Sequence, residues 1–378
     1  MAFDFDTVID RRSSDSIKWG RYAGRDILPL WVADMDFISP PAVITALQER
    51  LAEGVFGYGG ATPLMIEAIL LALARDYGWA VAPEWLVPLP GLVSGLNIAA
   101  RAVGEPGDAL LTVTPIYPPF LSAPRNQGRD TITVALRETV FGWEWDWPAM
   151  EAAVTPRTRG IELCHPHNPT GRVWRADELE MLASFAERHD LIVISDEIHC
   201  DLILEPGLRH QPFALATPAL AHRTITLMAP SKTYNIAGLG ASFAIIPDAG
   251  LRKTFEQAMA GIVPHVNVLG LAACAAAYAH GTAWRAELLN YLRANRERVM
   301  VTLDGHKGMK VSKPEATFLA WIDCRATGIS QPRQFFEQSG VGLSDGAEFG
   351  MPGFVRLNFG CPRRTLNEAL MRMRDAFR

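Results

Sequence analysis

Short apolar runs of strand length, separated by segments with helical periodicity, place the strongest constraint on the fold. The five runs are residues 109–113, 160–163, 191–194, 224–228 and 241–246. Between the second and the third run, residues 176–188 put leucines and alanines on one helical face. Strand, helix and strand in this order indicate a βαβ unit. The sequence therefore predicts an α/β fold with a mostly parallel central sheet.

The segments on either side of these runs predict how the 378 residues are divided. Residues 1–45 carry prolines and tryptophans but few helical signals, and we expect an arm that packs with a small domain. Residues 46–265 are predicted to form the large domain, and residues 266–378 a smaller α+β domain. Helices are expected at 41–51, 63–77, 94–102, 268–278, 283–303 and from 365 onward, and further strands at 317–322 and 354–359.

Charge and composition exclude several classes of function. The chain has 36 Lys and Arg against 41 Asp and Glu, and no basic run, so nothing favours nucleic-acid binding. No apolar run approaches the ~20 residues of a membrane span. Residues 1–15 are acidic and lack the features of a signal peptide. We expect a cytoplasmic protein that binds neither nucleic acid nor a membrane.

The five cysteines are widely spaced and include no CxxC pair. An odd number in this arrangement predicts neither a disulfide framework nor a zinc site. We expect them to be small buried residues and expect no metal.

Polar residues follow three of the apolar runs directly. The sequence HPHNPTG (165–171) follows the second run, SDEIH (195–199) the third, and APSK (229–232) the fourth. In an open parallel sheet, ligands bind beyond the carboxyl ends of the strands. The three groups are therefore predicted to meet in one crevice.

Two residues of that crevice carry groups that can react or bind a charged ligand. Burial behind a strand lowers the pKa of Lys232, which makes its amine a nucleophile suited to Schiff-base chemistry. A buried Asp196 needs a cationic partner, and a pyridinium nitrogen is one such partner. The alternative is that Asp196 and Lys232 simply pair with each other. NPTG taken alone is equally explained as a turn.

The ordered set NPTG, SDEIH and SKTYNIAG changes this balance. It resembles the fold-type I enzymes of the aminotransferase class I/II superfamily, which use pyridoxal 5′-phosphate (PLP). More narrowly, the chain resembles the cystathionine β-lyase-like branch of C–S lyases. That likeness extends over about residues 1–375, through LPLWVADMDF (28–37), VFGYGG (55–60), PGLVSGLNIA (90–99), PIYPPF (115–120) and RLNFGCPR (356–363).

The resemblance implies roles for the cofactor-binding residues. Lys232 carries PLP as a Schiff base and then moves protons, and Asp196 pairs with the pyridine nitrogen. Asn168 donates a hydrogen bond to the phenolic oxygen, and Tyr117 stacks on the ring. The turn formed by Gly91, Leu92 and Val93, with Ser231, binds the phosphate at a helix start.

The resemblance also implies how the substrate is held and how copies assemble. Arg356 binds the carboxylate of a small amino-acid substrate, next to Ala33. Tyr58 contributes to catalysis and reaches the phosphate of a second subunit, so a homodimer with shared active sites is expected. The alternatives are a strand-face ion pair for Arg356, a packed loop aromatic for Tyr117, and a turn or surface-loop role for Gly91 and Tyr58.

Two positions depart from the common aminotransferase pattern. His199 stands where many relatives carry Tyr, and Gly240 stands where many carry an Arg. Both departures resemble the C–S lyase branch. His199 is taken as a cofactor-binding residue, although the resemblance leaves open whether it replaces the missing phenol.

The resemblance implies β-elimination from L-cystathionine or a related L-cysteine S-conjugate, which yields a thiol, pyruvate and ammonia. One alternative is an aminotransferase that requires a 2-oxo acid acceptor. Another is a protein of this fold that serves as a regulator of a protein partner. The intact Lys232 and Asp196 argue against a protein without catalysis.

Overall fold

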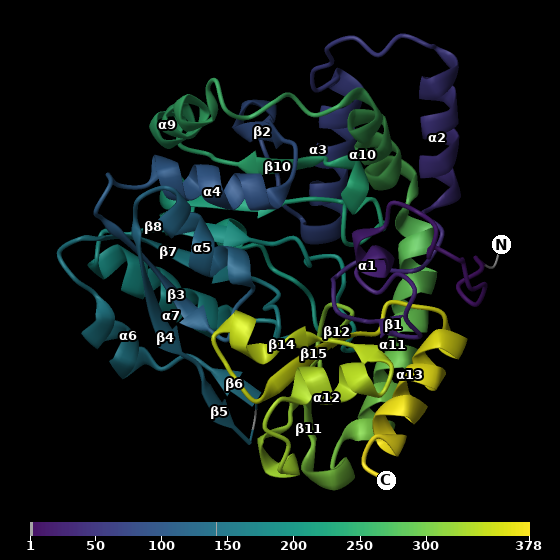
Figure 1. Cartoon of the computed structure of the whole chain (residues 1–378). Helices are drawn as coiled ribbons and strands as arrows, with labels where there is room; N and C mark the ends of the chain where they lie inside the picture. The colour runs from purple at the N-terminus through teal and green to yellow at the C-terminus, as the bar shows by residue number, and fades with distance from the viewer. Residues whose placement is uncertain (1–2, 141) are drawn as a thin grey trace.

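The structure is a computed structural model that describes residues 3–140 and 142–378. Its centre is a seven-stranded sheet with helices on both faces, and a smaller four-stranded sheet lies below it in Figure 1. The large sheet has the order β2 (Leu86–Leu89), β10 (Ser242–Ile245), β9 (Thr224–Met228), β8 (Ile192–Asp196), β7 (Thr158–Cys164), β3 (Ala109–Thr114) and β4 (Asp130–Ala135).

Strand β10 is antiparallel to both of its neighbours, and the pairings from β9 to β4 are all parallel. The predicted mostly parallel sheet is therefore confirmed. Helices cover both of its faces, so the inner strands β7, β8 and β9 are buried at nearly every position.

Two layers of helices make two cores with this sheet. One core packs side chains of α4 (Leu92–Ala102), α5 (Pro118–Asn126) and α9 (Ala249–Met259) on the sheet. On the other face, α6 (Trp147–Ala153), α7 (Ala176–Arg188) and α8 (Phe213–Ala216) pack in the same way. The ends of the strands are left open between these layers.

The C-terminal part of the chain forms the smaller sheet and its helices. The antiparallel sheet has the order β11 (Lys310–Ser312), β12 (Leu319–Asp323), β15 (Phe354–Asn358) and β14 (Ser344–Asp345). The helices of this part of the chain are α10 (Val268–His280), which packs away from the small sheet, and α11 (Thr282–Leu303), α12 (Pro332–Gln338) and α13 (Arg363–Asp375). A separate pair joins β5 (Arg137–Thr139) to β6 (Gly142–Glu144). Short 3-10 helices occupy Pro83–Trp85, Pro218–Arg223, Ala237–Leu239, His306–Gly308, Arg325–Thr327 and Gly346–Phe349.

The N-terminal segment crosses to the C-terminal part. After α1 (Ile17–Gly20), strand β1 (Leu28–Pro29) pairs in parallel with β13 (Val341–Gly342). The purple segment in Figure 1 accordingly lies against the yellow C-terminal elements. Helices α2 (Pro41–Ala52) and α3 (Pro63–Tyr77) then pack on α10. The domain boundaries at residues 45 and 265 stay predictions.

Helix α3 shows how closely local chemistry sets the element ends. Thr62 accepts a hydrogen bond from the Met65 amide, and Pro63 begins the helix. Gly78 ends the helix in the left-handed conformation, with φ of 66°. The predicted helix at 63–77 is confirmed residue for residue.

Other elements were not predicted. Helix α5 carries Pro118, Pro119 and Pro124, and prolines are not typical of a helix in sequence. Strand β4 is a partly exposed edge strand and has no continuous apolar run. The expectation that the cysteines are small buried residues is confirmed, because all five are buried. Within the described ranges, no helix is long and apolar enough to span a membrane.

Candidate active site

A cavity of about 250 Å³ lies at the carboxyl ends of β7, β8 and β9, beside the start of α4. Every predicted site residue except Tyr58 lines it, so the structure brings together the groups that the sequence placed after separate strands. The lining residues that were not predicted for the site are Val32, Ser94, Leu96, Cys164, Ile198, Ala237, Gly240, Ala241 and Ser242.

Lys232 follows β9 and points its amine into this cavity. Its Nζ donates a hydrogen bond to the Ala33 carbonyl at 2.6 Å. Although the side chain keeps some exposure as part of the cavity wall, desolvation lowers the pKa of Lys232 to about 8, against the opposing effect of the Asp34 carboxylate. Near neutral pH, a larger share of this amine is therefore unprotonated, and so nucleophilic, than at its ordinary pKa.

Asp196 ends β8 on the neighbouring strand and is buried. Its Oδ1 accepts a hydrogen bond from the Ile198 amide at 3.0 Å. Burial raises the pKa of Asp196 to about 7, and Lys232 opposes this only as a smaller effect. Among the described residues Asp196 has no ion pair, so the alternative of a direct Lys232–Asp196 pair is wrong. The carboxyl group is left to bind a cation inside the cavity.

Arg356 enters from β15 of the smaller sheet and is also buried. Its guanidinium donates to Asn168 Oδ1 at 3.0 Å and to the Trp31 carbonyl at 2.9 Å. It also stacks over the Phe349 ring at 4.7 Å. Burial lowers the pKa of Arg356 to about 10.

No carboxylate pairs with Arg356 in the part of the chain that the structure describes, and its Nε has no hydrogen-bond partner there. The strand-face ion pair considered from the sequence is therefore wrong. A buried guanidinium without a counter-ion is costly, so Arg356 is a candidate anion site within the cavity.

A second candidate anion site lies at the start of α4. Gly91 is the residue before the helix, with φ of 155°, and no side chain caps the first turn. The free amides of that turn and the hydroxyl groups of Ser94 and Ser231 border the same end of the cavity. A helix start of this kind suits a phosphate.

Gly240 explains why no arginine supplements this second site. The residue is in the left-handed conformation, with φ of 57°, and a Cβ atom there would lie 2.8 Å from the Pro90 carbonyl oxygen. A side chain would thus strain the backbone and collide with the turn that leads into α4. The glycine seen as a departure in the sequence is required by close packing.

Tyr117 and His199 complete the walls. Tyr117 is half-buried at the start of α5, and burial raises the pKa of its phenol. His199 is buried, its Nδ1 has no partner among the described residues, and burial lowers its pKa to about 3. The imidazole is therefore neutral and has a free nitrogen for a hydrogen bond.

Tyr58 does not reach this cavity within a single chain. Its side chain is fully exposed, and it lines a separate cavity of about 960 Å³ between α2, α3 and α10. The role assigned to Tyr58 stays a prediction that requires a second copy of the chain.

A buried polar cluster lies directly after Asp196, around Glu197. Glu197 contacts His210 Nε2 at 2.7 Å and accepts hydrogen bonds from Ser195 Oγ at 2.8 Å and the Phe213 amide at 2.9 Å. Burial raises the pKa of Glu197 and lowers that of His210. Sequence patterns did not predict this cluster, because His210 lies outside every motif.

Comparison with known proteins agrees with this geometry. The family model for aminotransferase class I and II matches residues 25–373. The chain belongs to the aminotransferase class I and II family. This family membership confirms the resemblance drawn from NPTG, SDEIH and SKTYNIAG.

Three relatives within this family are similar over their whole length. Cystathionine beta-lyase PatB of Bacillus subtilis (strain 168) is 36% identical over 385 residues, which cover 99% of each chain. The crystal structure of OvoB is 49% identical, covers 99% of each chain and has a TM-score of 0.97. Cystalysin from Treponema denticola, whose structure contains PLP, is 33% identical with a TM-score of 0.95, and 100% of this chain and 99% of that chain are covered.

Because Asp196 is buried, we predict that the free energy of unfolding of the cofactor-free protein depends on pH. Because its folded pKa lies near 7 and its ordinary value is 3.8, the folded state favours the protonated carboxyl. This contribution to stability is present at low pH and is lost as the pH rises through 7. We expect Asp196→Asn to raise the free energy of unfolding by a few kcal/mol at about pH 8, at ~1.4 kcal/mol per pKa unit, and less at about pH 5.

Urea unfolding of the cofactor-free protein at the two pH values measures this difference. Asp15→Asn, at an exposed carboxylate, is the matched control and should show no such gain. Equal effects of Asp196→Asn at both pH values would contradict the expected ionisation of Asp196.

The packing at Gly240 makes a second prediction. Gly240→Ala should lower the free energy of unfolding by about 1–2 kcal/mol and weaken phosphate binding. Gly207→Ala is the control, because Gly207 also has a positive φ, of 82°, but a Cβ atom there would have nothing within 4 Å. Chemical unfolding and phosphate titration of both variants separate collision from backbone strain. Identical behaviour of the two would show that the Pro90 contact is unimportant.

Proposed function

We propose that the protein is a PLP-dependent C–S β-lyase. In this proposal it cleaves L-cystathionine or a related L-cysteine S-conjugate, with one water molecule, to a thiol, pyruvate and ammonia. The observation that supports it best is the buried, carboxylate-free Arg356 on the same cavity as Lys232 and Asp196. A cation for a carboxylate, a nucleophilic amine and a buried carboxyl group together suit an α-amino acid and a pyridine cofactor.

The residues present fit PLP. Asp196 is a buried carboxyl group without a cation among the described residues, which suits a protonated pyridine nitrogen. The uncapped start of α4 suits the phosphate, and Lys232 lies in the same cavity. When bound, PLP supplies an electrophilic aldehyde and a ring that delocalises negative charge from the substrate Cα.

Each side chain then has a defined task. Lys232 Nζ would hold the cofactor through its aldehyde and would accept the proton from the substrate Cα. Asp196 holds the proton on the ring nitrogen. Asn168 Oδ1 already accepts a hydrogen bond from Arg356, so the Nδ2 group of Asn168 is left to donate to the ring oxygen. Tyr117 is proposed to stack on the ring.

Substrate orientation falls to Arg356 and the backbone near Ala33. The planar guanidinium can bind a carboxylate with two parallel hydrogen bonds. Arg356 and Lys232 both contact this backbone, which supports a substrate α-carbon lying between the carboxylate site and the amine. The leaving thiolate departs from Cβ once the Cα proton has been removed.

The aminotransferase alternative shares Lys232, Asp196, Asn168 and Arg356. The two reactions differ in whether a group leaves Cβ or a proton returns to the cofactor. Full-length similarity to a protein named cystathionine beta-lyase favours elimination. The decisive difference is that transamination needs a 2-oxo acid acceptor and elimination does not.

The expected activity is turnover of L-cystathionine with PLP and without any 2-oxo acid. Pyruvate, ammonia and free thiol should appear in equal amounts over many turnovers. Lys232→Ala should abolish all three, because no other amine lines the cavity among the described residues. Products that appear only after a 2-oxo acid is added would replace this proposal with the aminotransferase alternative.

We further propose that the enzyme is a homodimer whose subunits share their active sites. Tyr58 and its neighbours Val55, Phe56 and Leu64 expose large side chains around the cavity between α2, α3 and α10. An exposed apolar surface of this kind is suited to a protein interface. A cytoplasmic location is also proposed, because five free cysteines fit a reducing compartment.

Mixing two inactive variants tests the shared site. Tyr58→Ala lacks the side chain that reaches across, and Lys232→Ala lacks the amine. Heterodimers of the two contain one intact site of two, so the purified heterodimer should have about half of the wild-type activity. Co-expression with two affinity tags, followed by activity measurement of the doubly tagged species, provides the measurement. Absence of any recovery in a confirmed heterodimer would exclude the shared site.

A further inference from the structure

The segment of residues 31–37, termed the strap below, touches both cations of the cavity through its backbone. The Ala33 carbonyl accepts the hydrogen bond from Lys232, and the Trp31 carbonyl accepts from Arg356. Ser344 Oγ donates to the same Trp31 carbonyl at 2.6 Å. The position of the strap therefore sets what surrounds the amine and the guanidinium.

The strap has no helical or strand structure of its own. Asn358 Nδ2 donates to the Val32 carbonyl at 2.7 Å and to the Asp34 carbonyl at 2.9 Å. On the opposite side, Asn235 accepts from the Met35 amide at 3.2 Å and donates to the Phe37 carbonyl at 2.7 Å. Side chains from distant elements thus replace the backbone pairing that a strand would have.

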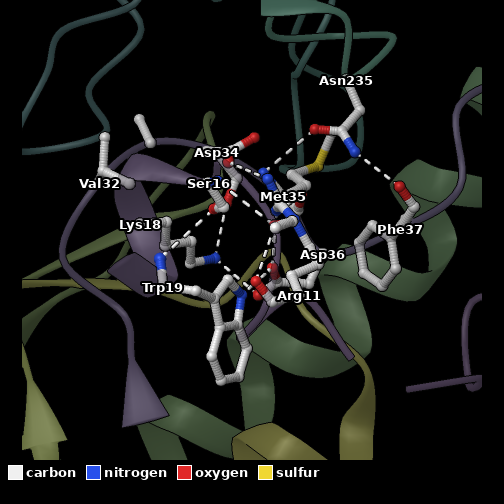
Figure 2. A network of polar contacts seen from close by, with 12 residues as sticks. Arg11, Ser16, Lys18, Trp19, Val32, Asp34, Met35, Asp36, Phe37 and Asn235 are labelled. Atoms are coloured by element: carbon white, nitrogen blue, oxygen red, sulfur yellow. Dashed lines mark hydrogen bonds and ion pairs between the residues drawn. The ribbon is translucent and has the colours of Figure 1, made fainter. Parts of the chain in front are cut away.

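The N-terminal arm adds a buried ionic network to the strap (Figure 2). Lys18 Nζ donates to the Asp34 carbonyl and to Asp36 Oδ2, each at 2.7 Å. Trp19 Nε1 and an Arg11 nitrogen both reach Asp36 Oδ1 at 3.0 Å. The Lys18 side chain is 0% exposed and that of Asp36 is 5% exposed, so solvent cannot substitute for these contacts.

We propose that Lys18 and Asp36 are positioning residues, which hold the strap so that the Ala33 carbonyl stays on Lys232 and the Trp31 carbonyl stays on Arg356. The proposal rests on the function proposed above, because it assigns these residues to the activity of Lys232. Figure 2 shows the two side chains meeting beneath the strap, between α1 and Asp34. An ion pair gives directed contacts that an apolar pair of equal volume lacks.

The charges that face Lys232 give the expected direction of change. Asp34 of the strap and Asp196 of β8 favour the charged amine, whereas Arg356 of β15 and burial disfavour it. The neutral His199 contributes no charge. A displaced strap would remove the Ala33 carbonyl and the Asp34 carboxylate from the amine, and both losses lower the pKa of Lys232.

The test replaces the ion pair by apolar residues of similar size. Removal of one partner would leave a buried lone charge and endanger folding, whereas the double variant Lys18→Met with Asp36→Leu removes both charges of the pair. In this variant Arg11 keeps its ion pair with Asp34, and Trp19 Nε1 loses its acceptor. The control is Arg296→Met with Glu205→Leu, which removes a partly buried pair that joins α11 to a loop and does not touch the strap. Thermal unfolding shows whether the variants are equally folded.

Two readouts follow the position of the strap. In cofactor-free protein, the pH dependence of Lys232 labelling by acetic anhydride is followed by mass spectrometry of its peptide. We expect the midpoint of the strap variant to fall by about half a pH unit or more, with no change in the control. With PLP and L-cystathionine, kcat/KM should fall at least about tenfold in the strap variant only.

Three results would overturn the positioning role. They are an unchanged Lys232 midpoint, a loss of activity that follows thermal stability in both double variants, and unchanged values in every readout. Failure of the proposed function is recognised separately, because the wild-type protein would then not cleave L-cystathionine. The labelling midpoint of Lys232 still decides the proposal in that case.

Discussion

The hydrogen bond between Lys232 and the Ala33 carbonyl is the contact on which the rest of the site depends. A carbonyl oxygen holds the amine in place without fixing its charge, whereas a carboxylate would hold it as an ammonium ion. Asp196 is near enough to influence the amine but does not pair with it. This separation leaves one group free as a nucleophile and the other free to bind a cation.

The sheet explains how the separation is maintained. Asp196 pairs with Leu227 in the register of β8 and β9, and Lys232 lies beyond the end of β9. The two side chains thus come from adjacent strands at different depths. Arg356 comes from another sheet, and a segment without regular structure joins it to the amine. The cavity is therefore built at the junction of the two sheets, where regular pairing ends.

Some residues of the site could be predicted from the sequence, and others could not. Asn168, Asp196 and Lys232 each follow an apolar run closely, so strand positions alone brought them together. The partners of Arg356 could not be found in this way, because Asn168 lies 188 residues away and Trp31 lies 325 residues away. The role of Tyr58 depends on a second chain, about which a single sequence pattern carries no geometric information.

The buried network below the strap shows a further limit of sequence patterns. Lys18 and Asp36 are charged residues in a segment with few structural signals, and such residues are usually exposed. Their burial follows only from the path of the arm across the C-terminal part. An apolar pair would also fill this space. A charged pair differs because its hydrogen bonds have a fixed direction. Directed contacts from Lys18 reach the Asp34 carbonyl and the Asp36 carboxylate, and the neighbouring Ala33 and Trp31 carbonyls bind Lys232 and Arg356. In the proposed function, the ends of the substrate would then be bound by fixed elements, and the choice among thioethers would fall to other parts of the cavity wall.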